Sequence, residues 1–261
     1  MSELAFVLRG LGFWAPGYPT PEAWAGRPAD CPEDQAAAPR AELLPPMLRR
    51  RTSLLTRMAA EVAQQAIRRG GLDPAHTAMV YGSVYGEIRT TLDLLAALLE
   101  PGAALSPTKF HNSVHNTAAG YVSISAGNRV GDAALTAGRS TLAAGLLDAA
   151  ARVACEGGDA VLVIAEEPLP EPLAAGLRYG PLAAAFAVSA PGRPNMPGRP
   201  CLLVQGANDM SIRPSVPPWL ADNPCAAALA LIDAAMRPDA AAVALEPDRQ
   251  AGWQCRLAGP A

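Results

Sequence analysis

Apolar residues along the chain follow two patterns, which predict an alternation of strands and helices. Short apolar runs bounded by glycine, proline or charged residues predict strands at 4–14, 78–85, 133–136, 160–165, 182–188, 201–205, 240–245 and 253–257. Apolar residues spaced by three and four predict helices at 53–69, 87–99, 116–126, 140–154 and 225–236. Alternating strands and helices of this kind predict a layered α/β domain.

Proline-rich stretches separate parts of this pattern. Residues 16–46 combine proline and alanine with scattered acids, so we expect a long surface loop there. Residues 206–221 show few periodic signals. A chain of 261 residues, half of them hydrophobic, can bury roughly three quarters of its unfolded surface in one domain. We therefore expect a single domain over residues 1–261.

The turn at residues 136–140 is the most informative local feature. It reads Thr-Ala-Gly-Arg-Ser and joins the expected strand at 133–136 to the expected helix at 140–154. In several enzyme families such a turn presents a nucleophile at a helix N-terminus, where backbone N–H groups and the helix dipole favour developing negative charge. Ser140 is the hydroxyl that this turn offers at the helix start.

The residues around this turn resemble the nucleophile region of β-ketoacyl synthases, which have the thiolase-like fold. Residues 116–124 read Asn-Thr-Ala-Ala-Gly-Tyr-Val-Ser-Ile, and residues 143–145 read Ala-Ala-Gly. In that family a helix with the pattern Asn-x-x-Ala-Gly-His-x-Ser-Ile precedes a Thr-Ala-Cys-x-Ser-Gly turn, which carries the acyl-accepting cysteine. The resemblance places that cysteine position on Gly138 or Arg139, and neither residue can be acylated.

Other groups of the synthase reaction are missing as well. In the resembled family a second half-domain supplies two histidines and a lysine. The three histidines of this chain all precede the turn, and its one lysine is Lys109. The resemblance covers about residues 1–190 and leaves residues 191–261 as a shortened C-terminal remnant that completes the sheet. It implies a truncated thiolase-like α/β domain that kept the fold and lost the reaction, so we expect no enzymatic activity.

The chain is most similar to the short, truncated chain-length-factor-like proteins found beside synthases of aryl polyene and related type II polyketide pathways. This resemblance implies a heterodimer with a β-ketoacyl synthase subunit. It also implies contact with an acyl carrier protein through that pair, and a role in shaping the acyl tunnel during polyene, polyketide or fatty-acid-like chain extension. No cofactor is expected.

The resemblance further implies particular residues for these roles. Phe110 and Val114 precede the 116–126 helix, in a segment that in synthases lies at the dimer interface and touches the partner's acyl pocket, although buried core explains them equally well. The strand at 132–136 meets its counterpart across the synthase dimer. Candidates for that interface are Tyr121, Val130, Ala133 and Leu135.

Three consecutive arginines precede the first long helix. Arg49, Arg50 and Arg51 could form a docking patch for an acidic carrier protein. Short charge runs are common on protein surfaces, so solvated charge at a loop-to-helix junction is the reading that we favour. The carrier-protein patch stays open as the alternative.

The cysteines leave a second kind of function open. Five widely spaced cysteines without a Cys-x-x-Cys motif argue against a disulfide framework or a zinc ribbon. We expect Cys155 to be a small apolar filler. Cys225 follows Asp-Asn-Pro at a predicted helix start, where its pKa could be lowered, but no histidine in this half of the chain offers a base, so a structural thiol is favoured. A stand-alone acyltransferase or thioester hydrolase using Cys225 or Ser140 is therefore one alternative, and a homodimeric acyl-binding protein is another.

Metal and polyanion partners are not expected. His111 and His115 are four residues apart, so on one helix they would share a face as zinc ligands can, but no third ligand is marked and structural histidines are favoured. A net charge of -3 and a pI near 5.7 give no case for nucleic acid or a membrane surface. No apolar run approaches the roughly 18 residues of a spanning helix. No secretory signal is visible, so we expect the cytoplasm.

Overall fold

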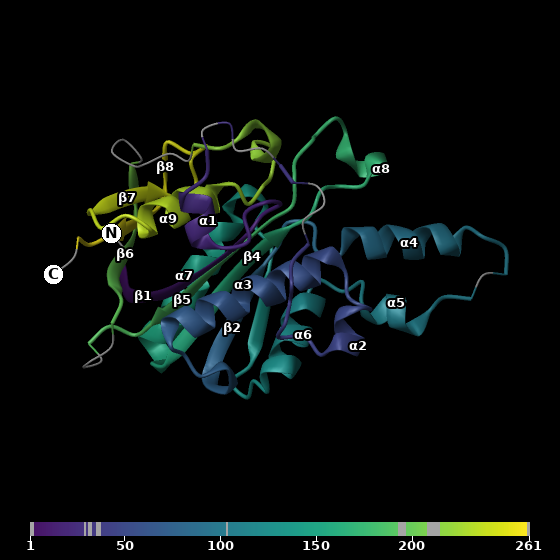
Figure 1. The fold of residues 1–261 in the computed structure, drawn as a ribbon, viewed down its shortest axis with the longest axis horizontal. Coiled ribbons are helices and arrows are strands. Elements are labelled where there is room, and N and C mark those ends of the chain that lie inside the picture. Colours follow the sequence, from purple (N-terminus) through teal and green to yellow (C-terminus); the bar gives the residue numbers. More distant parts are fainter. Residues whose placement is uncertain are drawn as a thin grey trace.

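The computed structural model describes residues 3–28, 30, 33–34, 38–102, 104–192, 197–207 and 215–259. Within these residues the strands form one eight-stranded sheet in the order β3-β2-β4-β5-β1-β6-β8-β7. Helices cover both faces of this sheet, as Figure 1 shows, so the molecule has three layers. The layered α/β architecture predicted from the sequence is confirmed.

The predicted strands and helices lie close to their expected positions, whereas four short helices, at residues 21–25, 46–49, 107–111 and 171–174, were not predicted. The strands are β1 (Glu3–Trp14), β2 (Thr77–Gly82), β3 (Asp132–Leu135), β4 (Asp159–Glu166), β5 (Leu182–Ser189), β6 (Arg199–Ala207), β7 (Ala241–Ala244) and β8 (Ala251–Leu257). The helices are α1 (Pro21–Ala25), α2 (Pro46–Arg49), α3 (Leu54–Gly70), α4 (Ile88–Leu98), α5 (Pro107–His111), α6 (Thr117–Ala126), α7 (Thr141–Glu156), α8 (Glu171–Ala174) and α9 (Ala227–Ala235). Every predicted strand and helix is present, and the largest shift is that β2 ends at Gly82 rather than residue 85.

Strand β4 shows why the sheet needs helices on both faces. Its even-numbered side chains from residue 160 to 164 join the core under α7, and its odd-numbered side chains from 161 to 165 join the core under α3. Successive side chains of a strand point to opposite faces of a sheet. The continuous apolar run therefore forms a strand buried on both faces, as predicted.

Helix α3 is defined at both ends by its sequence and packs very closely on β1. The Ser53 hydroxyl accepts a hydrogen bond from the N–H of Thr56, and Gly71, with a φ of 61°, ends the helix in the left-handed conformation. A Cβ atom on Gly12 of β1 would lie 2.0 Å from the carbonyl oxygen of Val62. The strand can therefore carry only glycine where the helix crosses it.

The prediction of a long surface loop at residues 16–46 is wrong in part. Helix α1 lies within this stretch, and its Trp24 is fully buried, with its ring centroid 4.9 Å from that of Phe13. Arg27 lies 4.0 Å over the Trp24 ring and forms a 2.9 Å ion pair with Asp233. A single buried tryptophan leaves no periodic signal, so the pattern missed this anchor. Residues 29, 31, 32 and 35–37, which include Cys31, lie outside the described residues.

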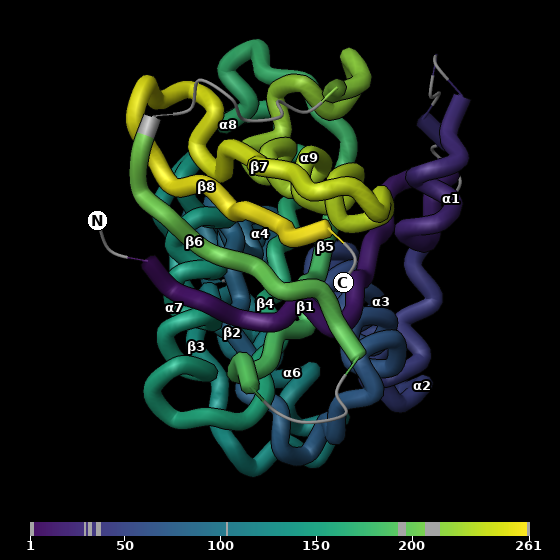
Figure 2. Tube along the Cα trace, turned by 90° about the vertical axis from the view of Figure 1, so that its left-hand side faces the viewer, coloured from purple at the N-terminus to yellow at the C-terminus, as the bar shows by residue number. Residues whose placement is uncertain are grey.

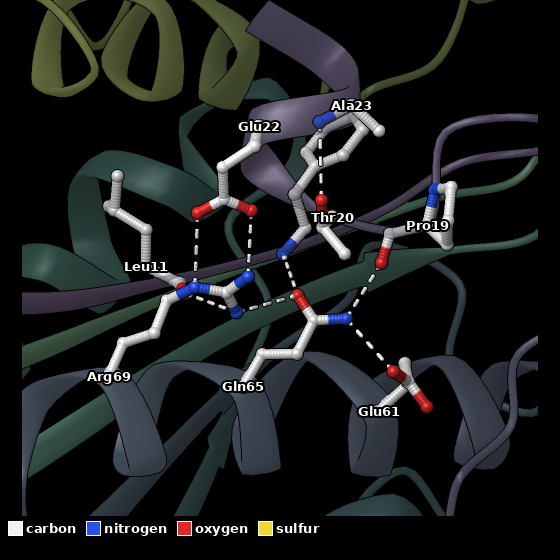
Figure 3. A network of polar contacts seen from close by, with 9 residues as sticks. Leu11, Pro19, Thr20, Glu22, Ala23, Glu61, Gln65 and Arg69 are labelled. Carbon is white, nitrogen blue, oxygen red and sulfur yellow. Dashed lines mark hydrogen bonds and ion pairs between the residues drawn. The ribbon is translucent and has the colours of Figure 1, made fainter.

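Side chains of α3 hold the same stretch from the other side (Figure 3). Gln65 accepts a hydrogen bond from the N–H of Phe13 at 3.1 Å and donates one to the carbonyl of Pro19 at 2.8 Å. Arg69 pairs with Glu22 of α1 at 2.8 Å. These bonds fasten the proline-rich segment to β1 and α3.

The C-terminal residues extend the sheet beyond β1. Figure 2 shows β6, β8 and β7 following β1 in succession, and each of these neighbours is antiparallel. Strand β1 lies between β5 and β6, so it is hydrogen-bonded on one side by residues before 190 and on the other by residues after it. The single domain over residues 1–261 and its division at residue 190 stay predictions.

Helices α4 and α5 project sideways from the rest of the molecule (Figure 1). Among the described elements α4 packs chiefly against α5. Leu94 is the only buried residue of α4, and α5 contains none. We call residues 88–102 and 104–111 the arm. An arm with so little core of its own leaves most of its side chains on the surface.

Candidate functional site

The turn between β3 and α7 has the strand-to-helix geometry that the sequence predicts. A single 3-10 turn spans Gly138–Ser140, and α7 begins at the next residue. The N–H of Ala137 donates to the Thr141 hydroxyl at 3.0 Å, and that hydroxyl donates to the carbonyl of Gly138 at 2.6 Å. Gly138 has a φ of +56°, and no heavy atom lies within 4 Å of where its Cβ would stand. The turn is thus formed and open, but it presents no nucleophile at this position.

The side chains that follow Gly138 are held by the loop between β7 and β8. Arg139 forms a 2.6 Å ion pair with Asp248, and the hydroxyl of Ser140 donates to the Glu246 carboxylate at 2.5 Å. Glu246 is buried and also accepts a hydrogen bond from the N–H of Trp253 at 3.0 Å. Residues 246–248 therefore lie against the turn and engage both polar side chains that it offers.

Cys225 does not have the environment of a nucleophile. It is buried two residues before α9 begins, and its N–H donates to the Asn223 side chain. Burial, and then the negative charge of Glu166, raise the pKa of the Cys225 thiol well above its ordinary value. The predicted lowering of this pKa is wrong because the thiol is sealed in the core. Cys155 is exposed at the end of α7, so its prediction as a core filler is also wrong.

The two histidines considered as zinc ligands lie on different elements. His111 ends α5, where its ring packs edge-on against Tyr121 at 6.0 Å. His115 lies in the turn before α6, with Nε2 2.9 Å from the carbonyl oxygen of Ser83. The shared helical face therefore does not exist. Across the described ranges, no three histidine, cysteine, aspartate or glutamate side chains gather closely enough to hold a metal ion.

Exposed apolar side chains concentrate on one part of the chain. Among the described residues, nine of the twelve large hydrophobic side chains that are exposed fall between residues 85 and 130. We call these nine the apolar face: Tyr85, Leu95, Leu98, Leu99, Leu105, Phe110, Val114, Ile124 and Val130. They belong to the arm and the residues just before and after it, to α6 and to the segment that leads into β3. Strand β3 is the edge of the sheet and pairs only with β2 in the described part of the structure.

The predicted tunnel and interface residues fall on or beside this apolar face. Phe110 is 64% exposed and Val114 is 43% exposed, so the explanation that they form buried core is wrong. Val130 is 49% exposed. Two further candidates, Ala133 and Leu135, are half-buried on the edge strand. All five side chains are therefore accessible to another molecule, but their roles stay predictions.

Tyr121 is the remaining interface candidate and is half-buried on α6. Its hydroxyl donates to the Asn112 side chain at 2.6 Å. This bond ties α6 to the segment that follows α5. Tyr121 thus supports the surface on which Phe110 lies.

The arginine run lies at the end of α2 and before α3. Arg50 and Arg51 are exposed and Arg49 is half-buried. Arg49 and Arg50 donate only to main-chain carbonyls, at 2.9 and 3.3 Å, and none of the three takes part in an ion pair within the described residues. Three positive charges without acidic partners among the described residues are available to an acidic molecule.

Three buried glutamates near the root of the arm were missed by the sequence analysis. Glu87 accepts hydrogen bonds from Ser53 and Thr56, both at 2.7 Å, and burial raises its pKa. Glu166 is the last residue of β4 and Glu167 directly follows it, and burial raises the pKa of each to about 7. Two acids directly after a continuous apolar strand were the available signal, because the end of such a strand is still inside the fold.

Comparison with known proteins places the chain in a family. Its residues 22–254 match the family described as "Beta-ketoacyl synthase, N-terminal domain". The chain belongs to this family. The resemblance drawn from residues 116–145 is therefore confirmed, as is the ketosynthase fold. No curated protein matches the sequence.

Solved structures of related complexes share this fold. The ketosynthase ApeO in complex with its chain length factor ApeC from Xenorhabdus doucetiae matches with a TM-score of 0.72 and 20% identity, covering 97% of this chain and 99% of that chain. The ishigamide ketosynthase/chain length factor matches with a TM-score of 0.59 and 14% identity, covering 79% and 68%. AntDE:AntF, a type II polyketide synthase acyl-carrier protein in complex with its ketosynthase, matches at 0.58 and 12%, covering 73% and 64%.

No helix within the described ranges combines the length and the apolar character needed to cross a bilayer.

Proposed function

We propose that the chain is a non-catalytic, chain-length-factor-like partner of a β-ketoacyl synthase. The observation that carries this proposal is the turn before α7, where the resemblance puts Gly138 or Arg139 at the family's nucleophile position. Acyl transfer needs a thiolate or an activated hydroxyl, together with a base and donors for the oxyanion. Arg139 and Ser140 are instead engaged by the acids of the β7–β8 loop. The site retains the turn without the reacting groups.

The apolar face supports the partner part of the proposal. Monomeric proteins rarely expose large apolar surfaces, and such surfaces commonly mark protein interfaces. The free edge of β3 adds unpaired N–H and C=O groups that a second strand can satisfy. The first of the similar structures is a ketosynthase with its chain length factor, and the matched chain has nearly the length of this one. We propose that β3, Val130, Ala133 and Leu135 meet the synthase.

The arm is the part of this surface that we propose to reach the acyl tunnel. Phe110 and Val114 lie at the end of α5 and just beyond it, and Tyr121 fixes the adjoining segment to α6. Large apolar side chains on an exposed arm can close one end of an apolar channel in a partner. Their size would then limit how far an acyl chain extends.

Restoring the nucleophile should not restore the reaction. Gly138→Cys places a thiol in open space, but the three histidines of the chain contact other groups, among them Asp73 with His76 at 2.6 Å. We expect no condensation product from Gly138→Cys, measured as ketoacyl thioester by mass spectrometry. The assay uses the isolated chain, or its complex with a synthase whose own nucleophile has been replaced. A measurable ketoacyl product would contradict this account of the site.

The unpaired arginines are a candidate contact for the acyl carrier protein. Exchanging Arg49, Arg50 and Arg51 for glutamate should weaken binding of an acidic carrier protein to the complex by about tenfold or more, because like charges then face each other. Titration calorimetry or fluorescence anisotropy at two salt concentrations measures this change. The wild-type affinity should fall more steeply with salt than that of the variant.

A matched triple variant separates local contact from net charge. Arg68, Arg237 and Arg256 are exposed arginines, and none of them forms an ion pair within the described residues. Their exchange for glutamate changes the net charge by the same amount. Equal weakening by both triple variants would show that no docking patch exists at residues 49–51.

The structure gives no support to a stand-alone enzyme. Cys225 is sealed in the core, and the hydroxyl of Ser140 is bound to a buried carboxylate. A homodimeric acyl-binding protein would use the same apolar face with a second copy of this chain. The oligomeric state with and without a synthase distinguishes the two partners.

A further inference from the structure

The root of the arm is fixed to the body by buried carboxyl groups. One oxygen of Glu166, Oε2, accepts hydrogen bonds from the hydroxyl of Ser83 at 3.2 Å and from the N–H groups of Val84 and Tyr85 at 2.6 and 3.4 Å. These three residues form the turn that leads from β2 into α4. Glu166 therefore holds the point at which the arm leaves the sheet.

Glu167 holds the first turn of α4 in a similar way. Its Oε2 lies 3.4 Å from Nε of Arg89, and the same arginine donates to the carbonyl of Pro168 at 3.2 Å. The Glu167 side chain is 2% exposed, whereas that of Arg89 is 53% exposed. The ion pair is thus long, and only one of its members is buried.

Each of the two carboxyl groups makes the contacts described above through Oε2, and its other oxygen, Oε1, is buried. Within the described residues, Oε1 of Glu166 and Oε1 of Glu167 are shielded from solvent and have no hydrogen-bond partner. An ionised carboxylate in this arrangement keeps a charged oxygen without compensation, which is costly in a protein interior. A carboxylic acid carries its proton on that oxygen and still accepts at Oε2. The hydrogen bonds accepted by Glu166 and the charge of Arg89 beside Glu167 favour the ionised form, but burial, which has the larger effect on both pKa values, favours the neutral form of both side chains.

We propose that Glu166 and Glu167 form a proton-controlled latch at the root of the arm: protonated, they hold the arm against the body, and ionised, they release it. Charged and titratable groups on several neighbouring elements face these two glutamates. These groups are Arg89 and Asp93 on α4, Glu87 before it, Tyr81 on β2, Tyr85 in the turn, Glu33, Tyr179 and Cys225.

The direction of the effect follows from the raised pKa of each glutamate, about 7, against an ordinary value of 4.5. The stabilising contribution is complete below the ordinary value and is lost as pH rises through about 7. Surface acids such as Glu22 and Asp73 have lowered pKa values, so their contribution to stability is present at higher pH and is lost as the pH falls. The arm should therefore loosen on the alkaline side. Any consequence for partner binding rests on the proposed function.

Hydrogen exchange of peptides covering residues 84–99 tests the latch. After correction for the intrinsic effect of pH on exchange, opening should become about tenfold more populated per glutamate between about pH 6 and about pH 8. Glu166→Gln and Glu167→Gln imitate the protonated form. Each substitution should therefore make the change in the open population between these two pH values about tenfold smaller. Glu171→Gln alters a glutamate that is 87% exposed on α8 and should leave the pH dependence unchanged.

The same pH dependence in wild type and in both glutamine variants would overturn the latch, as would its absence from wild type. Should the variants fail to fold, infrared spectroscopy of the wild-type protein decides. A carboxylic-acid carbonyl band should be present near pH 6 and absent near pH 8.5, on the two sides of the glutamate pKa. Its absence at both values would overturn the proposal. None of these measurements requires a synthase, so they remain decisive if the proposed partner is wrong.

Discussion

Replacing Val130 by arginine should abolish the stable complex that we propose between this chain and a β-ketoacyl synthase. Val130 is 49% exposed, so the substitution should change the stability of the chain itself by less than about 0.5 kcal/mol. In the complex the same position would be covered by the partner, next to the edge strand. An unpaired charge buried there costs several kcal/mol, which corresponds to a loss of affinity of about a hundredfold or more.

A matched substitution on another surface is the control. Leu173 of α8 is 43% exposed, and Figure 2 shows α8 at the top of the molecule and β3 towards the bottom. Leu173→Arg should leave the complex intact. Affinity-tagged co-purification and surface plasmon resonance compare the two variants. Equal binding by Val130→Arg and wild type would show that Val130 and the adjoining part of the apolar face do not contact the synthase.

Adding one methyl group to β1 should destabilise the whole fold. In Gly12→Ala the new Cβ would lie 2.0 Å from the carbonyl oxygen of Val62 and 3.0 Å from its Cα. These are backbone atoms, so the helix must move as a unit. Helix α3 contributes ten buried residues, and displacing it disturbs the core on that face of the sheet. We expect a loss of about 3 kcal/mol or more in the free energy of unfolding.

The same exchange on α6 is the internal control. No heavy atom lies within 4 Å of a Cβ built on Gly120. Alanine is favoured over glycine inside a helix, so Gly120→Ala should raise stability by up to about 1 kcal/mol. Urea unfolding monitored by circular dichroism gives both values. A Gly12→Ala protein as stable as wild type would show that the strand and the helix do not approach as closely as described.

Local patterns predicted the eight described strands and the five longer helices, but they predicted neither the short helices α1, α2, α5 and α8 nor the surroundings of individual side chains. The run at 160–165 predicted a strand buried on both faces because its own residues carry that information. By contrast, the burial of Trp24 depends on Phe13 and on the distant Asp233 through Arg27. No periodicity within residues 16–46 contains those contacts.

The candidate site likewise has features that the local sequence predicts and features that depend on distant residues. The turn at 136–140, with Gly138 and Arg139 where the resemblance leads one to expect a cysteine, is a property of the local sequence. The high pKa of Cys225 comes first from burial in the folded core and then from the charge of Glu166, which is far away in the chain. Whether Phe110 is core or surface is decided by how the arm projects, and the arm is placed by glutamates on β4 and before α4. Sequence spacing alone does not bring these residues together.

The central claim is that this chain works as the partner of a β-ketoacyl synthase. The direct test is size-exclusion chromatography with light scattering, on the chain expressed alone and then together with the ketoacyl synthase encoded beside it. The account predicts a stable one-to-one complex. A well-behaved homodimer that does not associate with the synthase would contradict it.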